Sequence, residues 1–181
     1  MKKIITLLFL VSAFVCFSQN KKLEYENFKL QDDKKLIWQK VYEYKGSKDT
    51  IVKLLKVFIT SGSFLNKLKY DNYSFNGFSN YTKISDLRGL ALAVRTDYNC
   101  FINIEIKENK YRVSISNVKF KPITMDCGSI EMETNFVLED ITVRNKHHEI
   151  RKNNTARKTL TRLNKDFIEV LTLRIKKKED W

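Results

Sequence analysis

The first eighteen residues constrain this chain most, because they carry the pattern of a segment that is removed before folding. Lys2 and Lys3 precede a largely apolar run over residues 4–17. As a helix this run is too short to cross a hydrocarbon core of about 30 Å. Small residues at positions 16 and 18 suit cleavage by a signal peptidase. The pattern predicts a secretory signal peptide over residues 1–18 and a mature chain that begins at Gln19.

Cys16 offers an alternative interpretation as a lipid-attachment cysteine. The bulky Phe14 and Val15 stand where small residues are preferred just before such a cysteine. We therefore expect soluble export to a periplasmic or extracellular location, and lipoprotein anchoring is the alternative. No stretch of the mature chain is predicted to span a membrane.

Behind the leader we expect a short N-terminal segment, residues 19–33, and one α+β domain, residues 34–181. About 160 residues are enough for one sizeable core. Proline occurs once and glycine five times, and no repeat or low-complexity stretch marks a linker. The formal charge of +13 falls to +11 without Lys2 and Lys3. Such a charge predicts attraction to anionic partners.

The mature chain keeps two cysteines, Cys100 and Cys127. An even number outside the cytoplasm is compatible with one disulfide between them. Two buried free thiols are the alternative, and the sequence does not favour either.

Alternating aromatic and branched side chains predict a strand over residues 35–45, with both faces partly covered. Ser47 suits the N-cap and Asp49 the first turn of a helix that ends near Ser61 and Gly62. Its apolar stripe comprises Ile51, Leu54, Leu55 and Phe58. A last helix is predicted from Thr155, closing on the lysines at 176–178, with Leu160, Leu163, Phe167, Val170, Leu171 and Ile175 on one stripe.

Three strands are predicted in the middle of the chain from apolar residues that alternate: Leu90, Leu92 and Val94; Ile102, Ile104 and Ile106; Tyr111, Val113 and Ile115. Turns at residues 97–99 and 107–110 would place all nine on one face of an antiparallel meander. The opposite, wet face would carry Arg95, Asn103, Glu105, Arg112, Ser114 and Ser116. Residues 121–154 are less regular. We expect a strand over residues 131–143, interrupted at Glu139 and Asp140, and then a basic segment.

Several of these stretches resemble a known family. They are the leader, the aromatic strand KLIWQKVYEYKG, the helix after Gly-Ser-Lys, the meander strand KENKYRVSISNV and the final helix. Together they resemble a secreted domain of unknown function found in Bacteroidetes-type bacteria. The resemblance spans residues 34–178 and implies a TATA-binding-protein-like fold (TBP-like), a curved antiparallel sheet with two helices packed on one face. No activity is established for that family, so the resemblance implies compartment and fold only.

No catalytic motif is found. His147 and His148 are adjacent, so their side chains diverge on a strand or a helix, and no third histidine exists to complete a metal site. Glu131 and Glu133 would share one face of a strand, an arrangement compatible with the paired carboxylates of a glycosidase. One strand does not give the separation that such chemistry requires, so we interpret the pair as part of an exposed strand face. A glycine-rich phosphate loop, a nucleophile elbow and metal-binding spacings are all absent. We therefore predict no catalytic residues, no metal and no cofactor.

Two groups of residues point to binding. Tyr70, Tyr73, Phe75, Phe78 and Tyr81 lie among basic residues, as in single-strand binders, but export makes nucleic acid a disfavoured partner. A basic patch is predicted from Arg144, Lys146, Arg151, Lys152, Arg157 and Lys158. Such a patch would attract an envelope protein, a polysaccharide or an anionic lipid surface. The sequence favours a non-enzymatic binding domain at the cell envelope, and the alternative is an enzyme that acts on an anionic envelope substrate.

Overall fold

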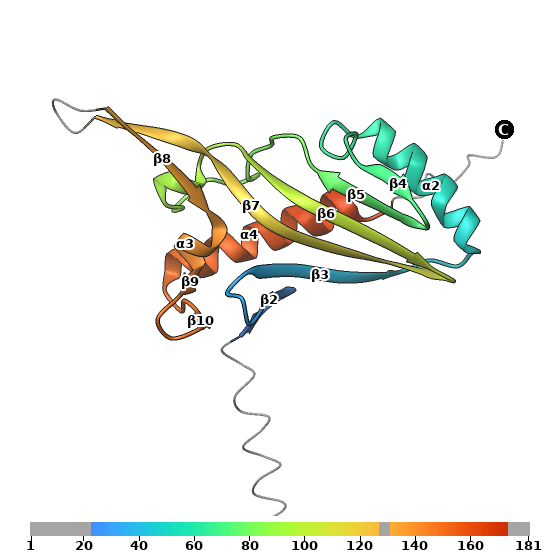
Figure 1. Cartoon of the computed structure of the whole chain (residues 1–181), viewed down its shortest axis with the longest axis horizontal. Helices are drawn as coiled ribbons and strands as arrows, with labels where there is room; N and C mark the ends of the chain where they lie inside the picture. Colours follow the sequence, from blue (N-terminus) through green and yellow to red (C-terminus); the bar gives the residue numbers. More distant parts are fainter. Residues whose placement is uncertain (1–22, 127–130, 174–181) are drawn as a thin grey trace, which may run out of the picture.

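The computed structural model describes residues 23–126 and 131–173 (Figure 1). The described strands are β1 (Glu24–Tyr25), β2 (Phe28–Leu30), β3 (Leu36–Glu43), β4 (Lys69–Asp71), β5 (Ser74–Phe78), β6 (Tyr98–Lys107), β7 (Lys110–Asp126), β8 (Glu131–Val137), β9 (Val143–Arg144) and β10 (Glu149–Ile150). The described helices are α2 (Lys48–Ser61), α3 (Leu138–Thr142), α4 (Asn154–Leu171) and one 3₁₀ turn, η2 (Leu92–Val94). The predicted signal peptide, Cys127 and the lysines at 176–178 lie outside the described residues.

Eight strands form one antiparallel sheet in the order β1-β2-β3-β7-β6-β5-β4, and β8 pairs with β7. The 17-residue β7 organises this sheet. Its first half pairs with β3, so that Ile115 faces Trp38, and its second half pairs with β8, so that Phe120 faces Phe136. β3 and β8 therefore follow one another along the same edge of β7. Beyond the sheet, β7 and β8 continue as a two-stranded arm (Figure 1).

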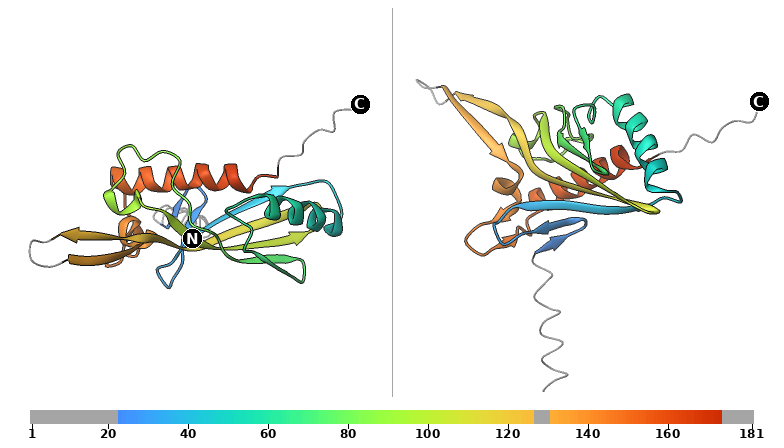
Figure 2. Two further views of the ribbon diagram at one scale, coloured as in Figure 1. Left: turned by 90° about the horizontal axis from the view of Figure 1, so that it is seen from above. Right: turned by 45° about the vertical axis from the view of Figure 1, so that its right-hand side comes forward.

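The core lies between one face of the sheet and the helices. Strands β6 and β7 bury six alternating residues there: Ile102, Ile104, Ile106, Tyr111, Val113 and Ile115. The predicted pairing across the turn at 107–110 is confirmed, because Ile106 faces Tyr111 and Ile104 faces Val113. Phe167 of α4 anchors the helix, since its ring centroid lies 5.5 Å from that of Trp38 and 6.2 Å from that of Tyr98. Figure 2 shows α4 running along this face of the sheet.

The other face of the sheet is not covered by any of the described elements (Figure 2). β3 shows the asymmetry clearly, because Trp38 is fully buried whereas Val41, on the other side, is 50% exposed. The expectation that both faces of this strand are partly covered is therefore corrected. Asn103, Glu105, Arg112, Ser114 and Ser116 do lie on the wet face, as predicted from their parity with the buried residues.

The predicted strand around Leu90, Leu92 and Val94 is wrong. Leu90 and Val94 are buried, but Leu92 is 65% exposed and lies in the 3₁₀ turn η2. β5 occupies the edge of β6 that this strand would have needed, with Phe75 facing Ile104. The predicted turn at 97–99 is also wrong, because β6 begins at Tyr98.

The expected strand over residues 131–143 breaks into β8, α3 and β9. Glu139 and Asp140 lie in the first turn of α3, where acidic side chains are favourable. The helix α2 is confirmed, with Ser47 as its N-cap, but its buried stripe comprises Ile51, Val52, Leu55 and Ile59. Leu54 of the predicted stripe is 37% exposed.

The last helix begins one residue earlier than predicted. Asn153 caps α4 by accepting a hydrogen bond from the backbone N–H of Ala156. Leu160, Leu163, Phe167 and Leu171 are buried as expected, whereas Val170 is half exposed and Ile175 lies outside the described residues. None of the helices in residues 23–126 and 131–173 is long and apolar enough to cross a membrane.

Candidate functional site

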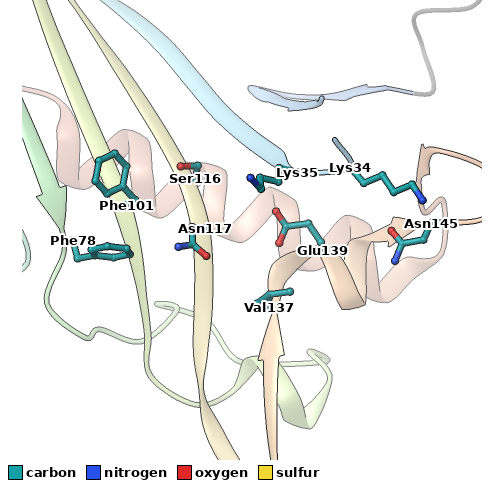
Figure 3. A pocket seen from close by; sticks show the side chains of 9 residues that line it. All are labelled: Lys34, Lys35, Phe78, Phe101, Ser116, Asn117, Val137, Glu139 and Asn145. Carbon is teal, nitrogen blue, oxygen red and sulfur yellow. The ribbon is translucent and has the colours of Figure 1, made fainter. Parts of the chain in front are cut away.

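An open cleft of about 620 Å³ lies at the junction between β3 and β8, which pair with successive parts of the same edge of β7. It belongs to the helix-free side of the sheet, because Phe78 and Phe101 on its wall stand opposite the buried residues of β5 and β6. Figure 3 shows its lining, which consists of Lys34, Lys35, Phe78, Phe101, Ser116, Asn117, Val137, Glu139 and Asn145. Segments from six separate parts of the chain therefore meet here.

Glu139 holds the two sides of the cleft together. Its Oε1 accepts a hydrogen bond of 2.9 Å from the backbone N–H of Leu36, the first residue of β3. The helix α3 positions this carboxylate, and that helix starts where Asp140 accepts a hydrogen bond of 3.0 Å from the N–H of Val137. Glu139 is the single acidic residue of the lining, and one of its oxygens is engaged in structure.

One end of the cleft is cationic. Lys35 forms an ion pair with Asp33 at 3.1 Å. The backbone N–H of Lys35, and then its ammonium group, lower the pKa of Asp33 below its usual value. Lys34 has a positive φ of 66° and, among the described residues, no partner for its ammonium group. In Figure 3 the side chains of Lys34 and Asn145 point toward one another across this end.

The other end of the cleft is aromatic. Phe78 and Phe101 meet edge to face, with ring centroids 5.4 Å apart, and Phe78 is 45% exposed. They stand in one cross-strand row with Ser116, because Phe101 faces Phe78 on β5 and Ser116 on β7. Asn117 follows with φ of 53°, a conformation that asparagine tolerates well. This row offers apolar rings beside a hydroxyl and an amide.

A second row of polar side chains crosses the helix-free face beside the cleft: Gln39, Ser114, Asn103 and Asn76. Gln39 donates a hydrogen bond of 2.9 Å to the hydroxyl of Ser114. Within the described part of the chain, the amides of Asn103 and Asn76 make no hydrogen bond. A third row is ionic, and in it Arg112 pairs with Glu105. The face is thus ordered in aromatic, amide and ionic rows.

Two solved structures resemble this arrangement of sheet and helices. A TBP-like protein from Parabacteroides distasonis superposes with a TM-score of 0.53 at 13% identity, covering 81% of this chain and 96% of that one. The fold is TBP-like. A DUF4468 family protein from Bacteroides ovatus gives a TM-score of 0.51 at 15% identity, covering 78% of this chain and 86% of that one. No protein-family model and no curated protein matches the chain.

These similarities confirm the TBP-like α+β fold expected from the sequence, and at 13% and 15% identity the likeness is one of fold. Both proteins come from Bacteroidetes, and neither name assigns a reaction. In this TBP-like chain, evidence for a site therefore comes from its own residues. The cleft and the polar rows share the face of the sheet that the helices leave uncovered.

The six residues of the predicted basic patch lie close in sequence but come from two elements. Arg144, Lys146, Arg151 and Lys152 lie on or beside the β9–β10 hairpin, and Arg157 and Lys158 lie in α4. Arg144 pairs with Glu149 at 3.2 Å, and Arg151 Nε donates to the carbonyl of Val143 at 2.9 Å. Lys158 Nζ lies against Gly89. The hairpin reaches the cleft through Asn145, between Arg144 and Lys146, and binding by the patch stays a prediction.

The other candidates from the sequence do not converge. His147 and His148 lie in the β9–β10 turn, and the described residues contain no group of three or more potential ligands placed for a metal. Phe75 is buried, whereas Phe78 faces the cleft. Tyr70 and Tyr81 are exposed, each with a lysine ammonium over its ring, Lys56 and Lys121 respectively. The five aromatic residues predicted as a group therefore do not form one surface.

Cys100 is fully buried in β6, and burial raises the pKa of its thiol to about 12. Cys127 lies outside the described residues, so the disulfide stays a prediction. Asp126, which precedes Cys127, is the last residue of β7. It lies seven residues beyond Lys119, which faces Asn99, the residue before Cys100. At about 3.3 Å per residue, the Cα atoms of Lys119 and Asp126 are roughly 23 Å apart along the strand, whereas bonded cysteines need Cα atoms within about 7 Å of each other. The course of β7 favours the alternative of free thiols.

Sequence reasoning missed most of the cleft. Ser116 was expected on the wet face, Lys35 at the start of a strand and Glu139 at a strand interruption. Lys34, Phe101 and Asn117 were given no role. One signal was available, because a large aromatic residue at 101 breaks an otherwise polar wet face. The meeting of Leu36 with Glu139, 103 residues apart, has no local signature.

Proposed function

We propose that this protein is exported and acts, without catalysing a reaction, as a binding domain at the cell envelope. The observation that carries the proposal is the cleft on the uncovered face of the sheet, which joins an exposed aromatic pair to a cationic end. Its volume falls within the range of about 300–1,000 Å³ that is usual for ligand sites. The side chains of Lys34, Ser116, Asn117 and Asn145 have no hydrogen-bond partner among the described residues, which leaves them for a ligand.

The make-up of the cleft favours binding over the alternative of an enzyme. General acid–base chemistry usually needs two titratable groups near the reacting bond. Glu139 is the one carboxylate of the lining, and it holds Leu36 in place. The lining includes neither histidine and no second carboxylate to act together with Glu139.

The binding surface is tested by retention on isolated cell envelopes of the native host. Phe78→Ala removes an exposed ring from the cleft and should release most of the protein into the supernatant. Leu92→Ala is the matched control, because Leu92 is also an exposed apolar residue but lies away from the cleft. The control should sediment as the wild type does. Equal retention of all three proteins would contradict the proposed site.

Export is tested separately by mass spectrometry of the protein from its native host. We expect a mature N-terminus near Gln19 and no lipid on Cys16, because residues 1–18 carry the signal-peptide pattern. A main species that retains Met1 in the cytoplasm would contradict export, and a chain starting at lipidated Cys16 would establish the lipoprotein alternative.

A further inference from the structure

We infer that the cleft binds an acidic oligosaccharide, with sugar rings along the aromatic row and a carboxylate at the Lys34 end. This inference rests on the proposed binding function and names its ligand class. It follows from three kinds of group that the cleft brings together: phenyl rings, amides and a hydroxyl without a hydrogen-bond partner among the described residues, and an ammonium group that none of those residues pairs.

The size and shape of the cleft suit an extended ligand of several rings. A dry cavity of about 150 Å³ holds one benzene molecule. The cleft encloses about 620 Å³ and opens onto the helix-free face. Figure 3 shows its long direction, from Phe78 and Phe101 at one end, past Ser116 and Glu139, to Lys34 and Asn145 at the other. A chain of sugar rings fits that course better than a compact headgroup does.

The hydrogen-bonding groups match sugar hydroxyls. Ser116, Asn117 and Asn145 each offer both a donor and an acceptor, and none has a partner within the described residues. Hydroxyl groups also donate and accept, so each pairing is satisfied in both directions. The second oxygen of Glu139 is an acceptor in the middle of the cleft and suits a hydroxyl donor. An anion without hydroxyl groups would leave these acceptors unmatched.

The cationic end determines that the sugar is acidic. Lys35 is partly neutralised by Asp33, so among the described residues the ammonium group of Lys34 is the unpaired positive charge of the lining. Lys146 follows Asn145 in the chain and adds a positive charge near this end, whereas Arg144 is paired with Glu149. A carboxylate next to Lys34 and the amide N–H groups of Asn145 would form charge-assisted hydrogen bonds. The aromatic end carries no such charge and suits the C–H faces of a sugar ring.

The test is calorimetric titration of the protein with tetragalacturonate and with its methyl ester. The two probes share their rings and hydroxyls and differ in charge. We expect tetragalacturonate to bind at least 10-fold more tightly than the ester, and more weakly at 500 mM than at 50 mM salt. Comparable affinity for both probes, or no binding of either, would overturn the inference.

Three variants locate the site. Phe78→Ala should weaken binding of both probes at least 10-fold. Asn145→Asp, which keeps the size of the side chain but adds a negative charge, should weaken the acid at least 10-fold and spare the ester. Lys165→Gln, an exposed lysine of α4 outside the cleft, should change either affinity less than twofold. Unchanged affinities in Phe78→Ala and Asn145→Asp would place binding elsewhere and overturn the inference.

A third probe, an eight-residue oligothymidylate, tests nucleic acid as the occupant. Tighter binding of this probe than of tetragalacturonate, lost in Phe78→Ala, would overturn the sugar assignment. If no sugar probe binds but envelope retention still depends on Phe78, the ligand class is wrong and the proposed binding function stands. If neither the sugars nor the envelopes bind, both are wrong.

Discussion

Glu139 in α3 accepts a hydrogen bond from the backbone N–H of Leu36 across 103 residues of sequence, at 2.9 Å. β3 begins at Leu36 and β8 ends just before α3, so the carboxylate joins the two strands that share one edge of β7. Leu36 is paired with Leu30 of β2 on one side but has no partner in β7 on the other, so the carboxylate supplies the missing acceptor. The cleft owes its form to this connection.

Replacing Glu139 by Ala should lower the free energy of unfolding by about 1–3 kcal/mol, because the partly buried N–H of Leu36 loses its acceptor. Glu139→Gln keeps an amide oxygen at the same position and should cost less than half as much. Urea denaturation at neutral pH measures both. An alanine variant as stable as the wild type would show that the hydrogen bond does not hold the two strands.

The two faces of β6 predict opposite responses. Ile104 is 1% exposed, so Ile104→Ala should cost about 2–5 kcal/mol through lost burial and the cavity it leaves. Glu105 lies on the wet face and pairs with Arg112, and exposed pairs contribute less than about 1 kcal/mol. Glu105→Ala should therefore shift the denaturation midpoint only slightly. Equal shifts in the two variants would mean that the faces are assigned wrongly.

The parts of this fold that could be predicted from sequence depend on local rules. The pairing of Ile106 with Tyr111 follows from a short turn, which Asn109 supports with φ of 60°, and from parity along the strands. Leu90 and Val94 are four residues apart, a spacing that alternation along a strand and a helical turn both satisfy. Which one forms is decided by β5, which takes the edge of β6.

The candidate site was harder to predict, because its residues are assembled by pairings distant in sequence. Phe78 meets Phe101 only through the register of β5 against β6. Lys34 and Asn145 meet at one cleft through strands that follow each other on β7. The basic patch was read from local sequence, which shows the charges but not that Arg144 and Arg151 are held by Glu149 and by the carbonyl of Val143.

Asp166 is a buried acid with a structural task. It is 8% exposed and accepts hydrogen bonds from both the backbone N–H and the hydroxyl of Ser85, which fastens a long loop to α4. Asp166→Ala should cost about 1.5–3 kcal/mol, since two donors lose a charged acceptor. Asp166→Asn retains one acceptor and should lie between the alanine variant and the wild type in thermal denaturation. An alanine variant with an unchanged midpoint would contradict this task.

The thiols provide a test of the sheet itself. Because burial raises the pKa of Cys100 to about 12, its thiolate is scarce at pH 8, and the folded protein should leave this residue unmodified by a thiol reagent. In denaturant without reductant, protein from the native host that starts near Gln19 should titrate two thiols, since the course of β7 separates its end from Cys100. No titratable thiol before reduction and two afterwards would establish the disulfide instead.

The central claim, that the helix-free face around the cleft is the binding surface, is tested most directly by amide chemical shifts. The labelled protein would be titrated with polysaccharide released from the envelope of its native host. The account predicts that perturbed amides cluster at Phe78, Phe101, Ser116, Asn117 and Asn145. Those of the exposed side of α4, such as Lys165, should stay unchanged. Perturbations confined to the helices, or none at saturating polysaccharide, would contradict it.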